Sequence, residues 1–253
     1  MRTCTIIIPA RLASTRLPNK LLLAETGKPL LQYAWEAARR ACLADRVLVA
    51  CDDKRIFDAV TNFGGVAIMT DPNAQCGTDR IAEVAATLDD DLIVNVQGDE
   101  PNLSPDSIDA LITLLRDSSS EAVMATLATP IRSREILDDP SCVKVVFDQG
   151  HRALYFSRSV IPYPRSWSET LLTQEPPLFY LHLGIYAYRR DFLLKLREIP
   201  RSPLEIAESL EQLRVLENGY TLLVGSVDER SVGIDTPEDY ARFVAGEREK
   251  SKS

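Results

Sequence analysis

The 253-residue sequence has no long apolar run, no excess of positive charge and no paired-cysteine motif. No stretch approaches the roughly 20 apolar residues that a membrane-spanning helix needs. The first apolar run, Thr5–Pro9, is too short for a signal peptide and is interpreted as a first strand. These absences predict a cytoplasmic protein that does not associate with membranes.

The net charge and the cysteines exclude further classes of protein. The net charge of −8 disfavours a nucleic-acid or anionic-membrane surface, because such partners attract basic patches. A small anionic substrate stays compatible with it, since a local cationic pocket can lie inside an acidic protein. The five cysteines show neither a CxxC pair nor metal-ligand spacing, so we expect reduced thiols that are mostly buried.

The first half of the sequence alternates short runs rich in Val and Ile with amphipathic helical patterns. Four runs are predicted strands: Thr5–Pro9, Arg46–Cys51, Val66–Thr70 and Leu92–Gln97. Three segments between them are predicted helices: Pro29–Cys42, Lys54–Phe63 and Thr78–Leu88. This alternation predicts an α/β fold with a mostly parallel sheet, and ligands of such sheets bind at the carboxyl ends of the strands.

From about Ala122 the pattern is rich in strands and poor in helix. The predicted strands are Val123–Thr129, Val143–Asp148, His151–Arg158 and Tyr180–Arg190. A tight turn with positive φ at Gly150 is expected after Asp148, and the proline-rich segment Ile161–Pro177 is expected to be a loop or lid. The remaining predicted elements are a long helix Pro203–Asn218 closed by Gly219, a strand Thr221–Val227 and a last helix from Pro237.

Two segments that follow predicted strands carry charged side chains. Pro9–Lys20 contains three cations among small residues, which suits a phosphate cradle. It is not a Walker loop, and the absence of GxGxxG disfavours a nicotinamide or flavin enzyme. Asn95–Pro101 places Asp99 at the end of a strand, where one carboxylate plus substrate phosphates suits Mg²⁺. The alternatives are a basic surface loop and a turn whose acids merely end the strand.

Two further charged residues stand at predicted helix starts. Thr236 can cap the last helix and Pro237 suits its first position, which leaves Asp235 without a helical role and available as a metal ligand. Arg80 lies in the first turn of its helix, where a cation opposes the helix dipole. That placement favours a role in binding a carboxylate or phosphate, although exposed arginines are common at such positions.

The last candidates face a possible sugar site. Strand alternation places His182, Tyr186 and other hydrogen-bonding side chains on one face around Gly184, which suits a polyol platform. A single histidine is otherwise more often structural. Glu211 and Gln212 flank the apolar stripe of the predicted helix, where they either face solvent or bind sugar hydroxyls.

Taken together, the motifs resemble the 3-deoxy-manno-octulosonate (Kdo) cytidylyltransferase family, also called CMP-Kdo synthetases. The likeness runs in order from residue 5 to about 240. Its motifs are PARLASTRLPNK, CGTDRIAEV, NVQGDEP, ATL, VKVVFD, ALYFSR, HLGIYAYR, SPLE, ESLEQLRVL and GIDTPED.

The resemblance implies one nucleotidyltransferase domain over residues 1–253, Rossmann-like and GT-A-like, with a β-rich insert at about 122–190 that serves as lid and dimer region. It implies that CTP and Kdo give CMP-Kdo and pyrophosphate for lipopolysaccharide synthesis, in a Mg²⁺-dependent homodimer. The resemblance assigns catalysis to Arg11, Lys20, Asp99 and Asp235, and it makes the two acids the metal ligands. The implied nucleotide-binding residues are Ala10, Arg11, Ser14, Arg16, Lys20, Cys76 and Gln97. The implied sugar-binding residues are Arg80, Arg158, His182, Tyr186, Glu211 and Gln212.

Three positions depart from the family pattern. Cys76 replaces an expected serine, Ile206 an expected histidine, and Tyr163-Pro164 an expected tryptophan-aspartate pair. These departures leave open the choice between Kdo and its 8-amino analogue. The other hypotheses are a sialic acid cytidylyltransferase, a nucleotide-sugar-dependent glycosyltransferase and a non-catalytic nucleotide sensor.

Overall fold

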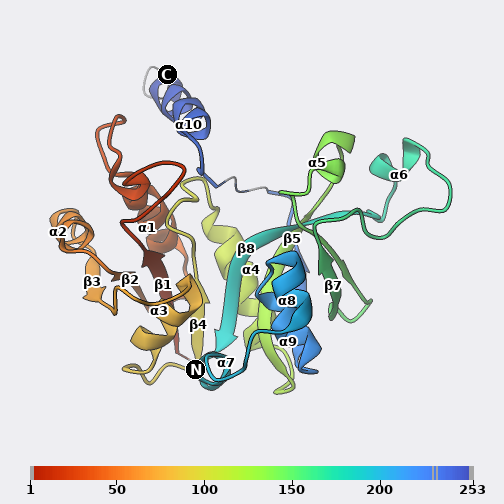
Figure 1. Ribbon diagram of the computed structural model, residues 1–253, viewed down its shortest axis with the longest axis horizontal. Helices are drawn as coiled ribbons and strands as arrows, with labels where there is room; N and C mark the ends of the chain where they lie inside the picture. The colour runs from red at the N-terminus through yellow and green to blue at the C-terminus, as the bar shows by residue number, and fades with distance from the viewer. Residues whose placement is uncertain (1–2, 230, 232, 251–253) are drawn as a thin grey trace.

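The computed structural model describes residues 3–229, 231 and 233–250. One nine-stranded mixed sheet forms the centre of the molecule, and helices pack on both of its faces (Figure 1). Seven strands follow the order β3-β2-β1-β4-β8-β5-β9, and β6 and β7 form a hairpin that joins the sheet through β8. The strands are β1 (Cys4–Ala10), β2 (Arg46–Cys51), β3 (Val66–Met69), β4 (Leu92–Asn95), β5 (Ala122–Pro130), β6 (Lys144–Phe147), β7 (Ala153–Ser157), β8 (Tyr180–Arg189) and β9 (Thr221–Ser226).

Helices connect most of these strands. They are the 3-10 helix η1 (Lys20–Leu22) and the α-helices α1 (Leu30–Arg40), α2 (Lys54–Asn62), α3 (Gly77–Ala85), α4 (Pro105–Arg116), α5 (Arg134–Asp138), α6 (Thr170–Thr173), α7 (Arg190–Leu196), α8 (Pro203–Glu208), α9 (Gln212–Glu217) and α10 (Pro237–Lys250). The α/β fold class and every predicted strand of both halves are confirmed, with ends that differ by up to two residues. Helix α4 was not among the predicted elements.

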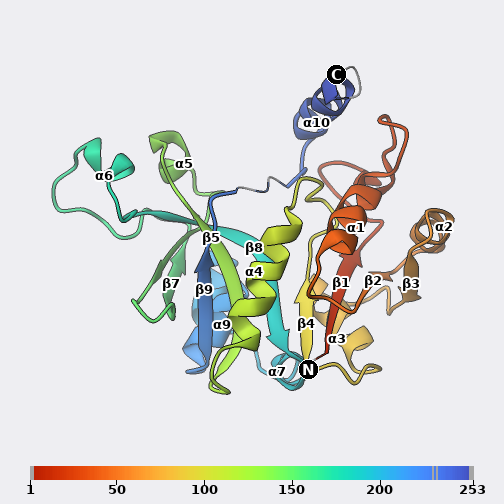
Figure 2. The ribbon, with the colours of Figure 1, turned by 180° about the vertical axis from the view of Figure 1, so that it is seen from behind.

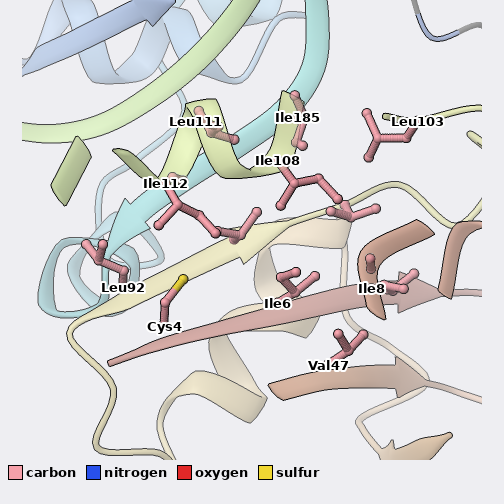
Figure 3. Close-up of a cluster of buried hydrophobic side chains, with 14 of the residues drawn as sticks. Cys4, Ile6, Ile8, Val47, Leu92, Leu103, Ile108, Leu111, Ile112 and Ile185 are labelled. Atoms are coloured by element: carbon pink, nitrogen blue, oxygen red, sulfur yellow. The ribbon is translucent and has the colours of Figure 1, made fainter. Parts of the chain in front are cut away.

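The sheet divides the core into two layers because successive side chains of a strand point to opposite faces. Ile6 and Ile8 of β1 pack with Ile108 and Ile112 of α4 on one face (Figure 3). Ile7 points to the other face, where α3 and α7 pack. All five side chains are fully buried. The isoleucine run of β1 therefore fits a strand that is covered on both sides.

The strand directions bring chemistry-bearing segments to one edge. β1 runs parallel to β2 and β4, so residues 10, 51 and 95 end their strands at the same edge of the sheet. β8 runs antiparallel to β4, with Tyr186 opposite Asn95. The loop after β4 consequently meets the middle of β8, and Gln97 donates from Nε2 to the Gly184 carbonyl at 3.3 Å.

The second half differs from its expected form in two details. Positive φ falls on His151 (φ 63°) and not on Gly150, because the Asp148 carboxylate accepts from the backbone N–H groups of Gly150 and Arg152 and so closes the turn one residue later. The segment Ile161–Pro177 is irregular except for α6.

The long helix expected over 203–218 is two helices, which is the second difference. Ser209 takes a left-handed conformation (φ 53°) and ends α8. The Glu208 side chain accepts from Ser157 and from the backbone of Arg158, which holds this bend against β7. Gly219 does follow α9 with φ 73°, as predicted.

The region around 122–190 contributes to two parts of the molecule. β5 and β8 lie inside the central sheet and the β6–β7 hairpin pairs with β8 and contacts β9, whereas α5 and α6 extend away from the sheet (Figures 1 and 2). All five cysteines are free thiols, as predicted, but only Cys4 and Cys51 are fully buried. Among the described residues no helix is long and apolar enough to cross a bilayer.

The core layer beneath α4 should dominate stability. Replacing fully buried Ile112 by alanine should lower the free energy of unfolding by about 2–5 kcal/mol, because the deletion removes buried methylene groups and leaves a cavity. Urea unfolding followed by circular dichroism measures this loss. Ile206→Ala is the matched control, since Ile206 is 58% exposed and should change stability by less than about 0.5 kcal/mol. Equal losses in the two variants would contradict this placement of the core.

Candidate active site

The ammonium of Lys20 joins two carboxylates that are distant in the sequence. Its Nζ donates to Asp99 Oδ2, to Asp235 Oδ1 at 2.9 Å and to the Ile234 carbonyl at 3.1 Å. The guanidinium of Arg16 pairs with the other oxygen of Asp235 at 3.0 Å. The cationic segment after β1, residues 11–20, is here called the basic loop. Its cations therefore contact both predicted metal ligands.

Local structure fixes each carboxylate. Asp99 follows β4, and its carbonyl accepts from Ile234 N–H at 2.9 Å, so the two chain segments are joined by a backbone hydrogen bond. Asp235 precedes α10, where Thr236 Oγ1 accepts from Asp239 N–H at 3.1 Å. The Asp239 carboxylate in turn accepts from the N–H groups of residues 235 and 236. This reciprocal cap occupies Thr236 and Asp239 and leaves the Asp235 side chain for the site.

An apolar cluster anchors the start of α10. Tyr240, Phe243 and Val244 pack with Leu17 and Leu30 next to the basic loop. The Tyr240 hydroxyl accepts from the backbone N–H of Glu25 at 3.0 Å. The last helix thus holds Asp235 against the loop that carries Lys20.

The clustered charges shift the ionisation of this site. Burial lowers the pKa of Lys20, but the Asp99 and Asp235 carboxylates beside it raise that pKa more, so the ammonium stays charged. Glu100, the next residue after Asp99, is desolvated and lies near both acids, which raises its pKa to about 7. Among the described residues no three His, Cys, Asp or Glu side chains form a metal cluster. Two carboxylates with room for phosphate oxygens fit a substrate-bridged Mg²⁺.

The basic loop is held from behind by a buried pair. Asp52 accepts from Leu12 N–H at 3.0 Å and lies 3.4 Å from Arg80 Nη2. Arg80 is fully buried and also donates to Thr70 Oγ1 and the Asp71 carbonyl. Arg11 of the loop donates to the Ala74 carbonyl at 2.7 Å.

Cys76 connects the start of α3 to the start of α9. Its sulfur caps α3 by accepting from Asp79 N–H at 3.4 Å, and its thiol donates to Glu211 Oε2 at 3.3 Å. Thr78 donates to the other oxygen of Glu211. Burial, followed by the nearby Glu211 charge, raises the pKa of Cys76 to about 12.

A cavity of about 640 Å³ opens beside the Lys20 cluster. Six of the predicted site residues line it: Arg16, His182, Tyr186, Glu211, Gln212 and Asp235. A larger hollow of about 920 Å³ shares Ser209 and Glu211 with it and continues past Cys76. His182, Gly184 and Tyr186 of the polar face predicted for β8 line this cavity, as do Leu181 and Leu183 of the opposite face.

The cavity offers neutral hydrogen-bonding groups. Burial lowers the pKa of His182 to about 3, so its ring is uncharged, and Nε2 lies 3.0 Å from Thr126 Oγ1. Tyr186 donates to Gln212 Oε1 at 3.3 Å. Among the described residues, the buried amide nitrogen of Gln212 has no hydrogen-bond partner.

The other predicted residues lie outside this cavity. Ala10 ends β1, Ser14 is half-buried in the basic loop, and Gln97 bonds to β8. Arg80 lies behind the loop and not in the cavity wall, because its guanidinium is used by Thr70, Asp71 and Asp52. Arg158 bonds to the carbonyls of Glu208 and Pro140, beside the cavity.

Three positions near the site escaped the sequence reasoning. Glu100 lines the cavity, Asp52 supports the basic loop, and Thr126 of β5 contacts His182. The sequence signal for Glu100 was its place beside Asp99. Asp52 follows β2 at the same sheet edge and was detectable by that rule. Thr126 carries no local signal, since only strand pairing brings it to His182.

A mixed α/β sheet with a basic loop facing two carboxylates defines a nucleotidyltransferase, and comparisons support this class. A model of the cytidylyltransferase family matches residues 5–228. A solved structure described as CMP:2-keto-3-deoxy-manno-octonic acid synthetase complexed with CTP superposes with a TM-score of 0.90 at 41% identity, covering 98% of this chain and 99% of that one. A 4-diphosphocytidyl-2C-methyl-D-erythritol synthase at 14% identity and TM-score 0.62 shares the fold.

Curated relatives make the assignment more specific. The 3-deoxy-manno-octulosonate cytidylyltransferase of Rhodopirellula baltica is 49% identical over 244 residues, which is 96% of this chain and 97% of that protein. The 8-amino-3,8-dideoxy-manno-octulosonate cytidylyltransferase of Shewanella frigidimarina is 46% identical over 238 residues, 93% of this chain and 94% of that protein. The chain belongs to the 3-deoxy-manno-octulosonate cytidylyltransferase family, which confirms the resemblance and the enzyme class.

The raised pKa of Cys76 predicts a thiol that reacts slowly with alkylating reagents. Because alkylating reagents attack the thiolate, a pKa of about 12 leaves on the order of one Cys76 in 10⁴ reactive at pH 8. Iodoacetamide should therefore modify exposed Cys42 at least about tenfold faster than Cys76 in the folded protein. Peptide mass spectrometry measures both rates, with urea-unfolded protein as the control in which they converge. Equal rates in folded protein would contradict the Cys76 environment.

The position of Arg80 predicts effects on stability and nucleotide binding. Arg80→Met should lower the free energy of unfolding by roughly 3–5 kcal/mol, since it leaves the Asp52 carboxylate without its buried partner. The double variant Asp52→Asn/Arg80→Met should recover part of that loss. In temperature-controlled kinetics the CTP KM should rise more than the sugar KM, because Asp52 also holds Leu12 of the basic loop. A change confined to the sugar KM would instead place Arg80 at the sugar.

Proposed function

We propose that the protein transfers CMP from CTP to the anomeric hydroxyl of Kdo and releases pyrophosphate, in the cytoplasm, to supply lipopolysaccharide synthesis. The observation that carries this proposal is the convergence of Lys20, Asp99 and Asp235 beside a polar cavity. Relatives named for this reaction match nearly the whole chain, and a similar structure was solved with CTP.

The cations of the basic loop would bind the triphosphate. Lys20 and Arg16 are held next to the acids, and Arg11 lies on the same loop. Asp99 and Asp235 would hold Mg²⁺, which, when bound, neutralises phosphate charge and makes the attacking hydroxyl more acidic. The residues themselves fix the geometry: a hydroxyl placed in line with the α-phosphate needs no covalent enzyme intermediate. Ala10, Ser14, Cys76 and Gln97 would contact the nucleotide.

The sugar would enter the cavity against β8 and α9. His182, Tyr186 and Gln212 present uncharged donors and acceptors, which suit hydroxyl groups. Glu211 lies at the junction of the two sides. Arg158 is the cation at the cavity margin, and Arg80 would act through the loop.

The 8-amino analogue of Kdo is the second candidate substrate. Relatives named for each sugar have similar identity to this chain, 49% and 46%. Of the three departures from the family pattern, Cys76 contacts Glu211 directly, whereas Tyr163 and Ile206 are exposed side chains. A cytidylyltransferase reaction is common to both candidates.

We further propose a homodimer that uses the β6–β7 hairpin and the segment around α6. The β6–β7 hairpin and the segment around α6 carry Leu154 and Tyr163, which are 61% and 85% exposed. Light scattering coupled to size-exclusion chromatography tests this: a mass of one chain, 28.2 kDa, would reject the dimer.

The reaction itself is tested by a coupled pyrophosphate assay. CTP, ATP, GTP and UTP are each combined with Kdo, 8-amino-Kdo and sialic acid, with and without Mg²⁺. The proposal expects release with CTP and Kdo in the presence of Mg²⁺. Release with 8-amino-Kdo alone would select the second candidate. A glycosyltransferase or a sensor would release no pyrophosphate with any pair.

The paired carboxylates give a specific mutational prediction. Asp99→Asn and Asp235→Asn should each lower kcat by at least about a hundredfold at saturating Mg²⁺, because neutralisation of the triphosphate is lost. Asp58→Asn is the matched control, since Asp58 is an exposed carboxylate on α2 that pairs with Lys54 of the same helix. Its kcat should stay within twofold of the parent. Near-normal turnover of either acid variant would contradict the metal assignment.

A further inference from the structure

Lys144 at the start of β6 is a buried cation outside the site described so far. Its side chain is fully buried, and Nζ donates to the carbonyls of Asp139 at 2.9 Å and Cys142 at 2.5 Å. Within the described residues it forms no ion pair with a carboxylate. Burial of an ammonium costs several kcal/mol, so a cation that serves only backbone carbonyls at this position calls for an explanation.

The two carbonyls belong to one turn, residues 139–142, here called the wall turn. Asp139 closes the turn by accepting from Ser141 N–H at 2.7 Å, and its other oxygen accepts from the Cys142 thiol at 3.7 Å. Arg158 donates to the Pro140 carbonyl at 3.1 Å from the opposite side. The turn is therefore fixed through its carbonyl oxygens by Lys144 and Arg158.

The wall turn forms part of the proposed sugar site. Ser141, Cys142 and Val143 line the 640 Å³ cavity together with His182. The Val143 carbonyl accepts from His182 N–H at 2.8 Å, so the end of the turn is joined to the polar strand β8. A shift of the turn would change the width of the cavity at His182 while leaving the basic loop and the acids in place.

We propose that Lys144 is a positioning residue for the sugar: by binding the carbonyls of residues 139 and 142 it fixes the wall turn against His182 and sets the shape of the sugar cavity. This inference rests on the proposed function, because it concerns that cavity. A merely structural lysine would affect stability and both substrates equally. A positioning lysine affects the sugar KM selectively, since a ground-state contact surface is lost.

The first test compares Lys144→Met with the wild-type enzyme. Methionine fills a similar volume without the charge or the donors. The sugar KM should rise at least tenfold, while the CTP KM stays within twofold and CTP binding by calorimetry is unchanged. The matched control is Arg190→Met, because Arg190 also caps backbone carbonyls, those of Ala85 and Ala86, at a place remote from the cavity. That control should leave the sugar KM unchanged.

Asp139→Ala provides a second variant in case Lys144→Met does not fold. It loosens the same turn from its partly exposed side and leaves the buried ammonium in place. The sugar KM should rise at least threefold with an unchanged CTP KM. An unchanged sugar KM in Asp139→Ala, or a parallel rise of both KM values in Lys144→Met, would overturn the positioning role. Absence of wild-type turnover would instead reject the proposed function, and the positioning role with it.

Discussion

The site depends on charge neutralisation at Lys20. Two carboxylates about 4 Å apart repel each other by about 4 kcal/mol at the effective dielectric constant typical near a protein surface. The fold nevertheless brings Asp99 and Asp235 to one point, and the Lys20 ammonium lies between them. Arg16 adds a second positive charge at Asp235. If Asp99 and Asp235 hold Mg²⁺ as proposed, the metal would neutralise the two carboxylates, and Lys20 and Arg16 would be available to phosphate oxygens.

The rest of the architecture supports that one contact. Parallel pairing of β1 with β4 places the basic loop beside Asp99, and the packing of α10 beside Leu17 brings Asp235 to the same loop. The buried pair of Asp52 and Arg80 holds the loop from the β2 side. Three separate segments therefore converge on a loop that carries no regular secondary structure before η1, and its shape is set by tertiary contacts.

The contrast between regular elements and a loop shaped by tertiary contacts explains what could be predicted from the sequence. Strands β1, β2 and β4 were predictable because their apolar runs are buried on both faces. Asp235 was identifiable because Thr236 and Asp239 account for the helix cap. Arg80 could not be placed, since its partners Thr70 and Asp52 come from neighbouring strands. The break at Ser209 was equally hidden, because Glu208 is held by Ser157 of β7 and not by its own helix. Local sequence patterns therefore predict local secondary structure, whereas a buried ionic contact depends on how distant segments are brought together by the fold.

The two halves of the proposed reaction site are connected through Glu211. Its carboxylate accepts from Cys76 and Thr78 at the start of α3 and pairs with Arg214 on α9 at 3.2 Å. These contacts hold the Glu211 carboxylate in the cavity wall, beside the other hydrogen-bonding groups proposed for the sugar, Gln212, Tyr186 and neutral His182. Because a thiol is a weaker hydrogen-bonding group than a hydroxyl, Cys76 makes this connection looser than serine would. Cys76 thus bears on how firmly the proposed nucleotide loop and the proposed sugar wall are held together.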